Sequence, residues 1–191
     1  MTARVTLTYQ DYAALPDDGK RYEIHDGELF VMAAPTSDHQ IVSAGLFRAL
    51  DRHVEARSLG LVLHAPLDVI LSDTAAATSI VQPDIVYLDS ERLPALHRRG
   101  VEGPPTLVIE ILSPTTAVTD RSRKRALYAR YGVPNFWLVD PDVRVIEAYV
   151  LRGGEYALAV RAAGGQPLDL PPFVDLGLVP DSLWSPFSLE P

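Results

Sequence analysis

The chain has 191 residues, of which 47% are hydrophobic and 22% charged, and its formal net charge is −8. This size and composition predict a single folded domain over residues 1–191 and exclude a disordered chain, which would be poorer in apolar residues. The absence of cysteine excludes disulfides, thiolate zinc sites and a cysteine nucleophile. Any metal must then be held by oxygen or imidazole ligands, which makes Mg²⁺ or Mn²⁺ the natural candidates.

Hydropathy and charge limit the location and the partners. No apolar stretch approaches the ~20 residues needed to cross a bilayer, and the N-terminus lacks the apolar run of a secretory signal. We therefore expect a cytoplasmic protein without a membrane partner. The net negative charge argues against a generic nucleic-acid binder, because Lys and Arg supply most of the non-specific affinity for phosphates.

The first predicted elements are a short helix and a β-hairpin. Thr8 is a suitable N-cap for a helix over residues 9–15. Residues 21–25 and 28–32 have the pattern of two strands, and the Asp26-Gly27 pair between them favours the positive φ angles of a two-residue turn.

The hairpin register decides which side chains share a face. With a two-residue turn, His25 pairs with Glu28 and Glu23 pairs with Phe30. Alternation then places Glu23, His25 and Glu28 on one face of the hairpin.

The middle of the chain combines helical periodicity with short apolar runs. The pattern predicts, in order, a helix over 38–58, a straight or bent strand over 59–71, a polar loop over 72–79, a short buried strand over 83–88, a surface loop with at most one helical turn over 89–105, and a central strand over 106–112.

The last third predicts one more helix and the rest of a sheet. The expected elements are a helix over 118–131, strands over 135–140, 143–151 and 155–160, and an extended tail over 162–191 that wraps the domain. The chain as a whole therefore reads as an α/β protein.

Two carboxylates stand within these apolar strands, where an ionised group is costly unless it is paired or binds a metal. Glu110 lies in the middle of the predicted central strand, and Asp84 opens the strand before it. If the two strands are neighbours, both carboxylates can meet and form a Mg²⁺ site. Alternatively, Asp84 is a turn residue and Glu110 a buried salt-bridge partner.

Lys124 is the candidate for a catalytic cation. It lies one turn beyond Asp120 on the helix that follows the Glu110 strand, so it can reach back towards the end of that strand. An ammonium group at this place can orient water and stabilise negative charge during phosphodiester hydrolysis. The alternative is an exposed i,i+4 ion pair with Asp120.

Basic residues concentrate around this lysine. One ten-residue segment contains Arg121, Arg123, Lys124, Arg125 and Arg130. Such a helix face is either a solvated surface or a contact for nucleic acid, for which Arg121, Arg123 and Arg125 are the candidates.

An ordered set of motifs resembles a known family. The segments RYEIHDGEL, APTSDHQ, QPDIVYL, LVIEILSPTT and YGVPNFWLVDP occur in the order found in the Uma-two family of restriction-endonuclease-like proteins. The resemblance implies a PD-(D/E)xK nuclease with a mixed β-sheet flanked by helices and an N-terminal hairpin. Pro83-Asp84 and Glu110 then match the acidic signature residues, whereas Leu112 stands where the plain signature has lysine. In this family the lysine lies on the following helix, which here means Lys124.

The resemblance also extends to substrate, assembly and additional residues. It implies a metal-dependent endonuclease acting on nucleic acid, with DNA as the expected substrate and a homodimer as the expected assembly. Candidates for lining the site are Glu23, Glu28 and His39, which match family positions, together with Asp120. Alternatively, Glu23 and Glu28 are surface charges on the hairpin, and His39 is a residue at the start of a helix. His25 departs from the family pattern and is interpreted as incidental.

The competing hypothesis is a non-catalytic nucleic-acid-binding or assembly module that keeps the nuclease fold.

Overall fold

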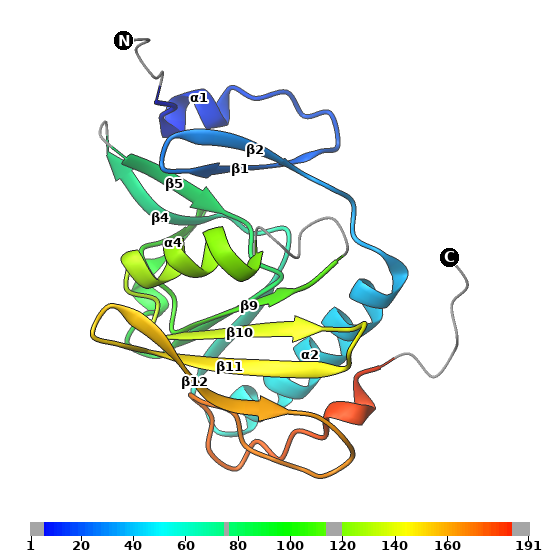
Figure 1. Ribbon diagram of the computed structural model, residues 1–191. Helices are drawn as coiled ribbons and strands as arrows, with labels where there is room; N and C mark the ends of the chain where they lie inside the picture. Colours follow the sequence, from blue (N-terminus) through cyan, green and yellow to red (C-terminus); the bar gives the residue numbers. More distant parts are fainter. Residues whose placement is uncertain (1–5, 75–76, 114–119, 185–191) are drawn as a thin grey trace.

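The computed structural model describes residues 6–74, 77–113 and 120–184 (Figure 1). The described strands form two six-stranded sheets. The first sheet has the order β2 (Glu28–Met32), β1 (Arg21–His25), β5 (Ala77–Val81), β4 (Val69–Thr74), β8 (Gly100–Glu102) and β7 (Leu96–His97). The second has the order β12 (Glu155–Ala162), β11 (Val145–Arg152), β10 (Asn135–Asp140), β9 (Leu107–Ile111), β6 (Ile85–Asp89) and β3 (Gly60–His64).

Helical segments connect and cover these strands. They are α1 (Tyr9–Ala13), α2 (Ser37–Ala56), the π-helical turn η2 (Asp120–Lys124), α4 (Arg125–Arg130) and the 3₁₀ turns η1 (Leu93–Ala95) and η3 (Pro180–Ser182). Thr8 caps α1 with a capping box, as predicted. None of the helices in the described ranges is long and apolar enough to cross a membrane.

Strand β9 is the centre of the second sheet. All five of its residues are buried, and it runs parallel to β10 and antiparallel to β6. Ile109 belongs to the apolar core on one face of the sheet, and Val108 to the core on the other face. The prediction of a central strand buried on both faces is confirmed.

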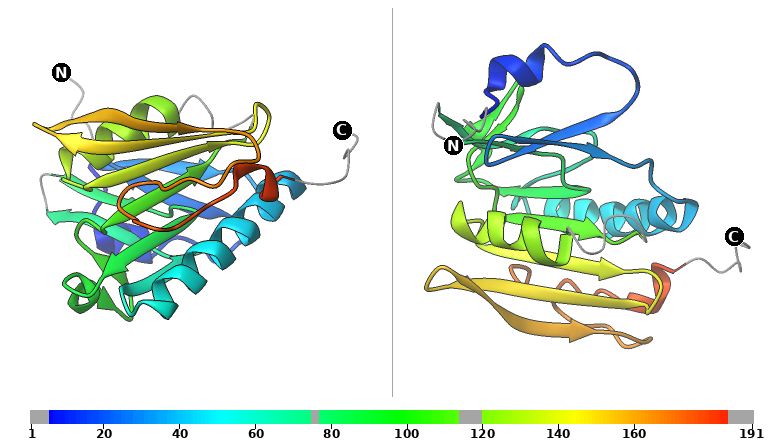
Figure 2. Two further views of the ribbon diagram at one scale, coloured as in Figure 1. Left: turned by 90° about the horizontal axis from the view of Figure 1, so that it is seen from below. Right: turned by 45° about the horizontal axis from the view of Figure 1, so that its top comes forward.

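Helix α2 and the C-terminal segment cover one face of this sheet. The apolar stripe of α2, which includes Leu46 and Leu50, packs against Ile109. Phe173 and Trp184 of the C-terminal segment join the same core. Figure 2 shows α2 and the red C-terminal segment on the same side of the sheet. As far as residue 184, the chain after residue 162 is the predicted extended segment that packs on the domain.

Helix α4 and the first sheet cover the other face. Leu127 and Tyr128 of α4 pack in one core with Val81 of β5 and Phe136 of β10. In Figure 1, α4 lies between the strands of the first sheet and strands β9 to β12. The hairpin of β1 and β2 joins this layer because Ile24 of β1 pairs with Ile80 of β5.

The structure corrects three predictions for the middle of the chain. The predicted single strand over 59–71 is two strands, β3 and β4, which belong to different sheets. The predicted polar loop over 72–79 is wrong, because most of it lies in the paired strands β4 and β5. The predicted surface loop over 89–105 contains the short strands β7 and β8 besides the turn η1.

The described part of the predicted helix over 118–131 is helical but not α-helical throughout. Residues 114–119 lie outside the described ranges. The remaining part is the π-helical turn η2, followed by the α-helix α4. A π-helical turn widens the helix by one residue per turn and so shifts the direction in which the following side chains point.

Candidate active site

Asp84 and Glu110 lie side by side on the face of the second sheet that α4 covers. The antiparallel register of β6 and β9 pairs Ile85 with Ile109. Continuing the register by one residue sets Asp84 opposite Glu110, and both carboxylates are buried. The expectation that the two strands are neighbours is therefore confirmed.

Two groups orient the Asp84 carboxylate. The backbone N–H of Ile111 donates a hydrogen bond to Asp84 Oδ2 at 2.8 Å, and Nε2 of His39 lies 3.0 Å from the same oxygen. His39 stands in the first turn of α2, so the start of this helix is tied to the sheet. Asp84 is thus a held, buried carboxylate rather than an exposed turn residue.

Lys124 reaches Glu110 from η2. Its Nζ donates to Glu110 Oε1 at 3.1 Å, and the hydroxyl of Tyr128 donates to the same oxygen at 2.5 Å. The Lys124 side chain is 2% exposed, so the interpretation as an exposed ion pair is wrong. The interpretation of Glu110 as a buried salt-bridge partner agrees with this pairing and is compatible with a catalytic role. Tyr128 was not among the predicted site residues, although it follows Lys124 by one helical turn and is one of the residues that match the family motifs.

Glu23 from β1 is the second carboxylate that contacts Lys124. Its Oε1 accepts hydrogen bonds from Lys124 Nζ and from the backbone N–H of Gln82, both at 2.9 Å. Its Oε2 lies 2.8 Å from Nε2 of His25. Burial by itself would raise the pKa of Glu23, but Lys124 and the hydrogen bond with His25 lower this pKa to about 2. Glu23 is therefore ionised at neutral pH.

His25 belongs to this cluster, although its sequence context suggested an incidental residue. The side chain is fully buried and stacks on the ring of Phe30 with 4.6 Å between ring centroids. The alternation of the hairpin already placed His25 on the same face as Glu23, which was the available signal. Only the packing of that face against η2 shows that it is interior.

Buried carboxylates outnumber buried lysines in this cluster. Glu23, Asp84 and Glu110 are three buried carboxylates, whereas Lys124 is the one ammonium group that contacts two of them. Buried charge of this kind is costly unless a cation offsets it.

A narrow recess opens between these residues. Asp84, Glu110, Lys124, His39 and Arg21 all line it. Its volume of about 20 Å³ admits a single water molecule or metal ion but not a nucleotide. Any larger ligand therefore has to lie across the mouth of the recess.

The donor set at this recess suits a hard divalent cation. Asp84 and Glu110 would hold the ion with carboxylate oxygens, the ligands that Mg²⁺ and Mn²⁺ prefer. Across the described ranges, no group of three or more His, Asp or Glu side chains that could hold a metal is found. An ion held by two carboxylates needs further oxygen ligands from water or phosphate, as is usual for Mg²⁺.

The remaining candidates lie at the edge of the cluster or outside it. Glu28 forms an ion pair with Arg123, whose guanidinium group lies 4.1 Å from the ring centroid of Phe30. Arg125 donates to the carbonyl oxygen of Tyr156. The side chains of Asp120 and Arg121 are outside the described part of the chain.

The fold and the buried Asp-Glu-Lys cluster define an α/β protein of the restriction-endonuclease-like class. A family model described as "Putative restriction endonuclease" matches residues 9–183, and the chain belongs to this family, Uma2. The family resemblance of the sequence motifs is thereby confirmed.

A solved structure shares this fold. The crystal structure of a putative nuclease of the family DUF820 from Anabaena variabilis ATCC 29413 superposes with a TM-score of 0.70. The match covers 93% of this chain and 97% of the other chain, at 19% sequence identity. No match is found among curated proteins.

Proposed function

We propose that the protein is a divalent-metal-dependent endonuclease that hydrolyses phosphodiester bonds in DNA, with Mg²⁺ or Mn²⁺ as its cofactor. Asp84, Glu110 and Lys124 form the catalytic core of this proposal. The observation that carries it is the recess itself, where two neighbouring buried carboxylates and a buried lysine line a space the size of one ion. Membership in a family described as restriction endonucleases supports the same reaction class.

Each residue of the core has a distinct part in the proposed reaction. A divalent cation, when bound, supplies the positive charge that polarises a phosphodiester and lowers the pKa of attacking water. Asp84 and Glu110 would hold this ion, and the hydrogen bonds from Ile111 and Tyr128 keep the two carboxylates in place. Lys124 stands beside Glu110 at the same recess, so its ammonium group stabilises the negative charge that develops on the phosphate.

The remaining features of the proposal concern position and assembly. His39 orients Asp84, and Glu23 holds Lys124 in its charged form at the recess. Cleavage of both strands of a duplex needs two such sites, so we propose a homodimer as the active assembly.

A non-catalytic binding module is the second candidate. The pairing of Lys124 with both Glu23 and Glu110 and the net charge of −8 favour it, because both would weaken an encounter with DNA. The two candidates differ in whether the protein cleaves DNA, because only the endonuclease needs an ionised Glu110 for its activity.

The substitution Glu110→Gln tests the proposal. The amide keeps the size of the side chain and can still accept hydrogen bonds from Lys124 and Tyr128, but it is a poor ligand for a hard cation. We expect Mn²⁺-dependent cleavage of plasmid DNA to fall at least about 100-fold, while circular dichroism shows an unchanged fold. Glu91→Gln, at an exposed position, is the matched control and should cleave like the wild type.

Metal binding provides a readout that is independent of cleavage. We expect Mn²⁺ to raise the melting temperature of the wild type and not that of the Glu110→Gln variant, because a ligand that binds only the folded state stabilises it. A wild type that cuts no DNA and melts at the same temperature with and without Mn²⁺ would favour the binding module.

A further inference from the structure

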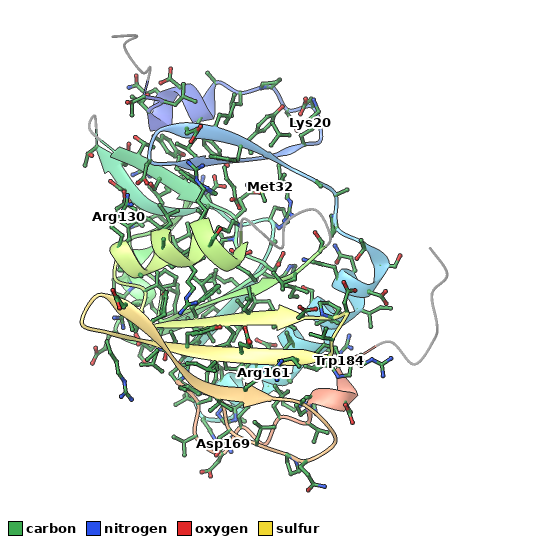
Figure 3. All side chains as sticks on the ribbon, in the orientation of Figure 1. Lys20, Met32, Arg130, Arg161, Asp169 and Trp184 are labelled. Carbon is green, nitrogen blue, oxygen red and sulfur yellow. The ribbon has the colours of Figure 1, made fainter. Side chains whose placement is uncertain are left out.

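Arg21 is a cation at the recess that the core described above does not use. It is the first residue of β1 and pairs with Met32 of β2 in the hairpin. Lys20 and Met32, labelled in Figure 3, mark this open end of the hairpin. Arg21 lines the same recess as Asp84, Glu110 and Lys124.

The Arg21 side chain is half-buried and has no partner among the described residues. It forms no side-chain hydrogen bond, ion pair or ring contact with any of them. The other half-buried arginines whose side chains are described all have partners, namely a carboxylate for Arg92, a carboxylate and a ring for Arg123, and a carbonyl oxygen and a ring for Arg125. Partial burial of an unpaired guanidinium group costs free energy, which an anionic ligand at the mouth of the recess would recover.

The size and charge of the recess indicate what this ligand is. A nucleotide does not fit into about 20 Å³, so a substrate presents its phosphate from the solvent side of the recess. Arg21 is half-buried and so more exposed than Asp84 and Lys124, which are buried. The carboxylates of the cluster repel a phosphodiester, and Lys124 is already engaged with Glu23 and Glu110. A guanidinium group offers two parallel N–H donors that match two phosphate oxygens.

We propose that Arg21 is the residue that binds the phosphodiester of the nucleic-acid backbone at the mouth of the active site. This inference rests on the proposed nuclease function and adds the contact that brings the phosphate over the recess. It also explains how an acidic protein engages an anionic substrate at this place.

The variants Arg21→Gln and Arg21→Lys test the proposal, with Arg152→Gln as the matched control. Arg152 is exposed and lies at the end of β11 away from the Glu110 site, so its substitution removes the same charge elsewhere. Binding of a fluorescent 20-base-pair duplex is measured by anisotropy in Ca²⁺ at several salt concentrations, and gels check that the duplex remains intact. Cleavage in Mn²⁺, Mn²⁺ affinity by calorimetry and the melting temperature complete the set.

We expect Arg21→Gln to weaken duplex binding and to lower kcat/KM about 10- to 100-fold. The slope of log Kd against log salt should decrease by about one, because one phosphate contact is lost. Arg21→Lys should recover part of the affinity, since it keeps the positive charge but lacks the two parallel N–H donors of a guanidinium group. Mn²⁺ affinity and the melting temperature should stay at the wild-type values, as should every property of Arg152→Gln.

Three results would overturn the inference. If Arg21→Gln binds and cleaves like the wild type, Arg21 is not the phosphate contact, and the nuclease proposal stands. If the variant loses Mn²⁺ affinity or melts at lower temperature in proportion to its loss of binding, Arg21 is a structural residue. If the wild type neither binds nor cleaves DNA, the proposed function fails, and the role of Arg21 fails with it.

Discussion

Glu23 joins three polar groups through its buried carboxylate. Its two oxygens contact Lys124, the backbone of Gln82 and His25, and its side chain is almost inaccessible. Burial opposes ionisation, but Lys124 and His25 favour it more strongly, so the pKa of Glu23 falls from 4.5 to about 2. A pKa that is lowered on folding stabilises the folded state above pH 4.5 and ceases to do so as the pH falls through about 2.

This coupling predicts the acid behaviour of a Glu23→Gln variant. At pH 7 we expect the variant to be less stable than the wild type by on the order of 3 kcal/mol, because Lys124 loses one of its two carboxylates. The difference should shrink between pH 4.5 and pH 2, where Glu23 of the wild type becomes protonated. Urea unfolding at pH 7, 4.5 and 2.5 measures it, with Glu91→Gln as control. A difference that is the same at all three pH values would contradict the assigned pKa.

At the scale of elements, the β1–β2 hairpin clamps the π-helical turn η2. The guanidinium group of Arg123 in η2 lies over the ring of Phe30, and the imidazole of His25 stacks on the same ring. The ion pair between Arg123 and Glu28 reinforces this contact. Because Lys124 follows Arg123 directly, the clamp also fixes the start of the lysine side chain.

An Arg123→Gln variant separates this clamp from the expected contact with nucleic acid. We expect a loss of about 1–2 kcal/mol in unfolding free energy, from the cation–π contact and a partly exposed ion pair. The salt dependence of duplex binding should remain that of the wild type. Urea unfolding and anisotropy titrations measure both quantities. An unchanged stability with a reduced salt slope would instead assign Arg123 to the nucleic-acid interface.

At the scale of the whole molecule, the C-terminal segment completes the core on the α2 face. The Phe173 ring packs against Tyr87, Trp137 and His53, and Trp137 Nε1 donates to the carbonyl oxygen of Pro171 at 2.6 Å. This segment is therefore part of the folded unit and supports the sheet that carries Asp84 and Glu110.

The neighbouring residues 173 and 174 provide a matched test. Phe173 is 4% exposed and Val174 is 72% exposed. We expect Phe173→Ala to lower the unfolding free energy by about 3–5 kcal/mol, because it leaves a cavity in the core. Val174→Ala should change it by less than about 0.5 kcal/mol. Equal effects in urea unfolding would show that the segment is not held in the core.

Local patterns determined much of the second sheet and of α2. The continuous apolar run around Glu110 predicted a central strand buried on both faces, and the helical spacing of Val42, Leu46, Leu50 and Val54 predicted a helix. Asp84 and Glu110 stood out because a carboxylate in an apolar strand needs a partner. The family motifs indicated that the lysine comes from the following helix.

The tertiary structure decided the remainder, because contacts between distant segments leave no local pattern. Residues 72–74 and 77–79 lie in strands because β4 pairs with β5, Ile80 of β5 pairs with Ile24, and Thr78 O accepts a hydrogen bond from Gly27 N. His25 becomes a member of the buried cluster only when the hairpin packs on η2. The sequence by itself therefore determined which charged residues require partners. Only the fold decided which partners they meet. Apolar neighbours along a strand indicate that a charged residue will be buried, whereas the partners that it meets depend on how whole elements are packed.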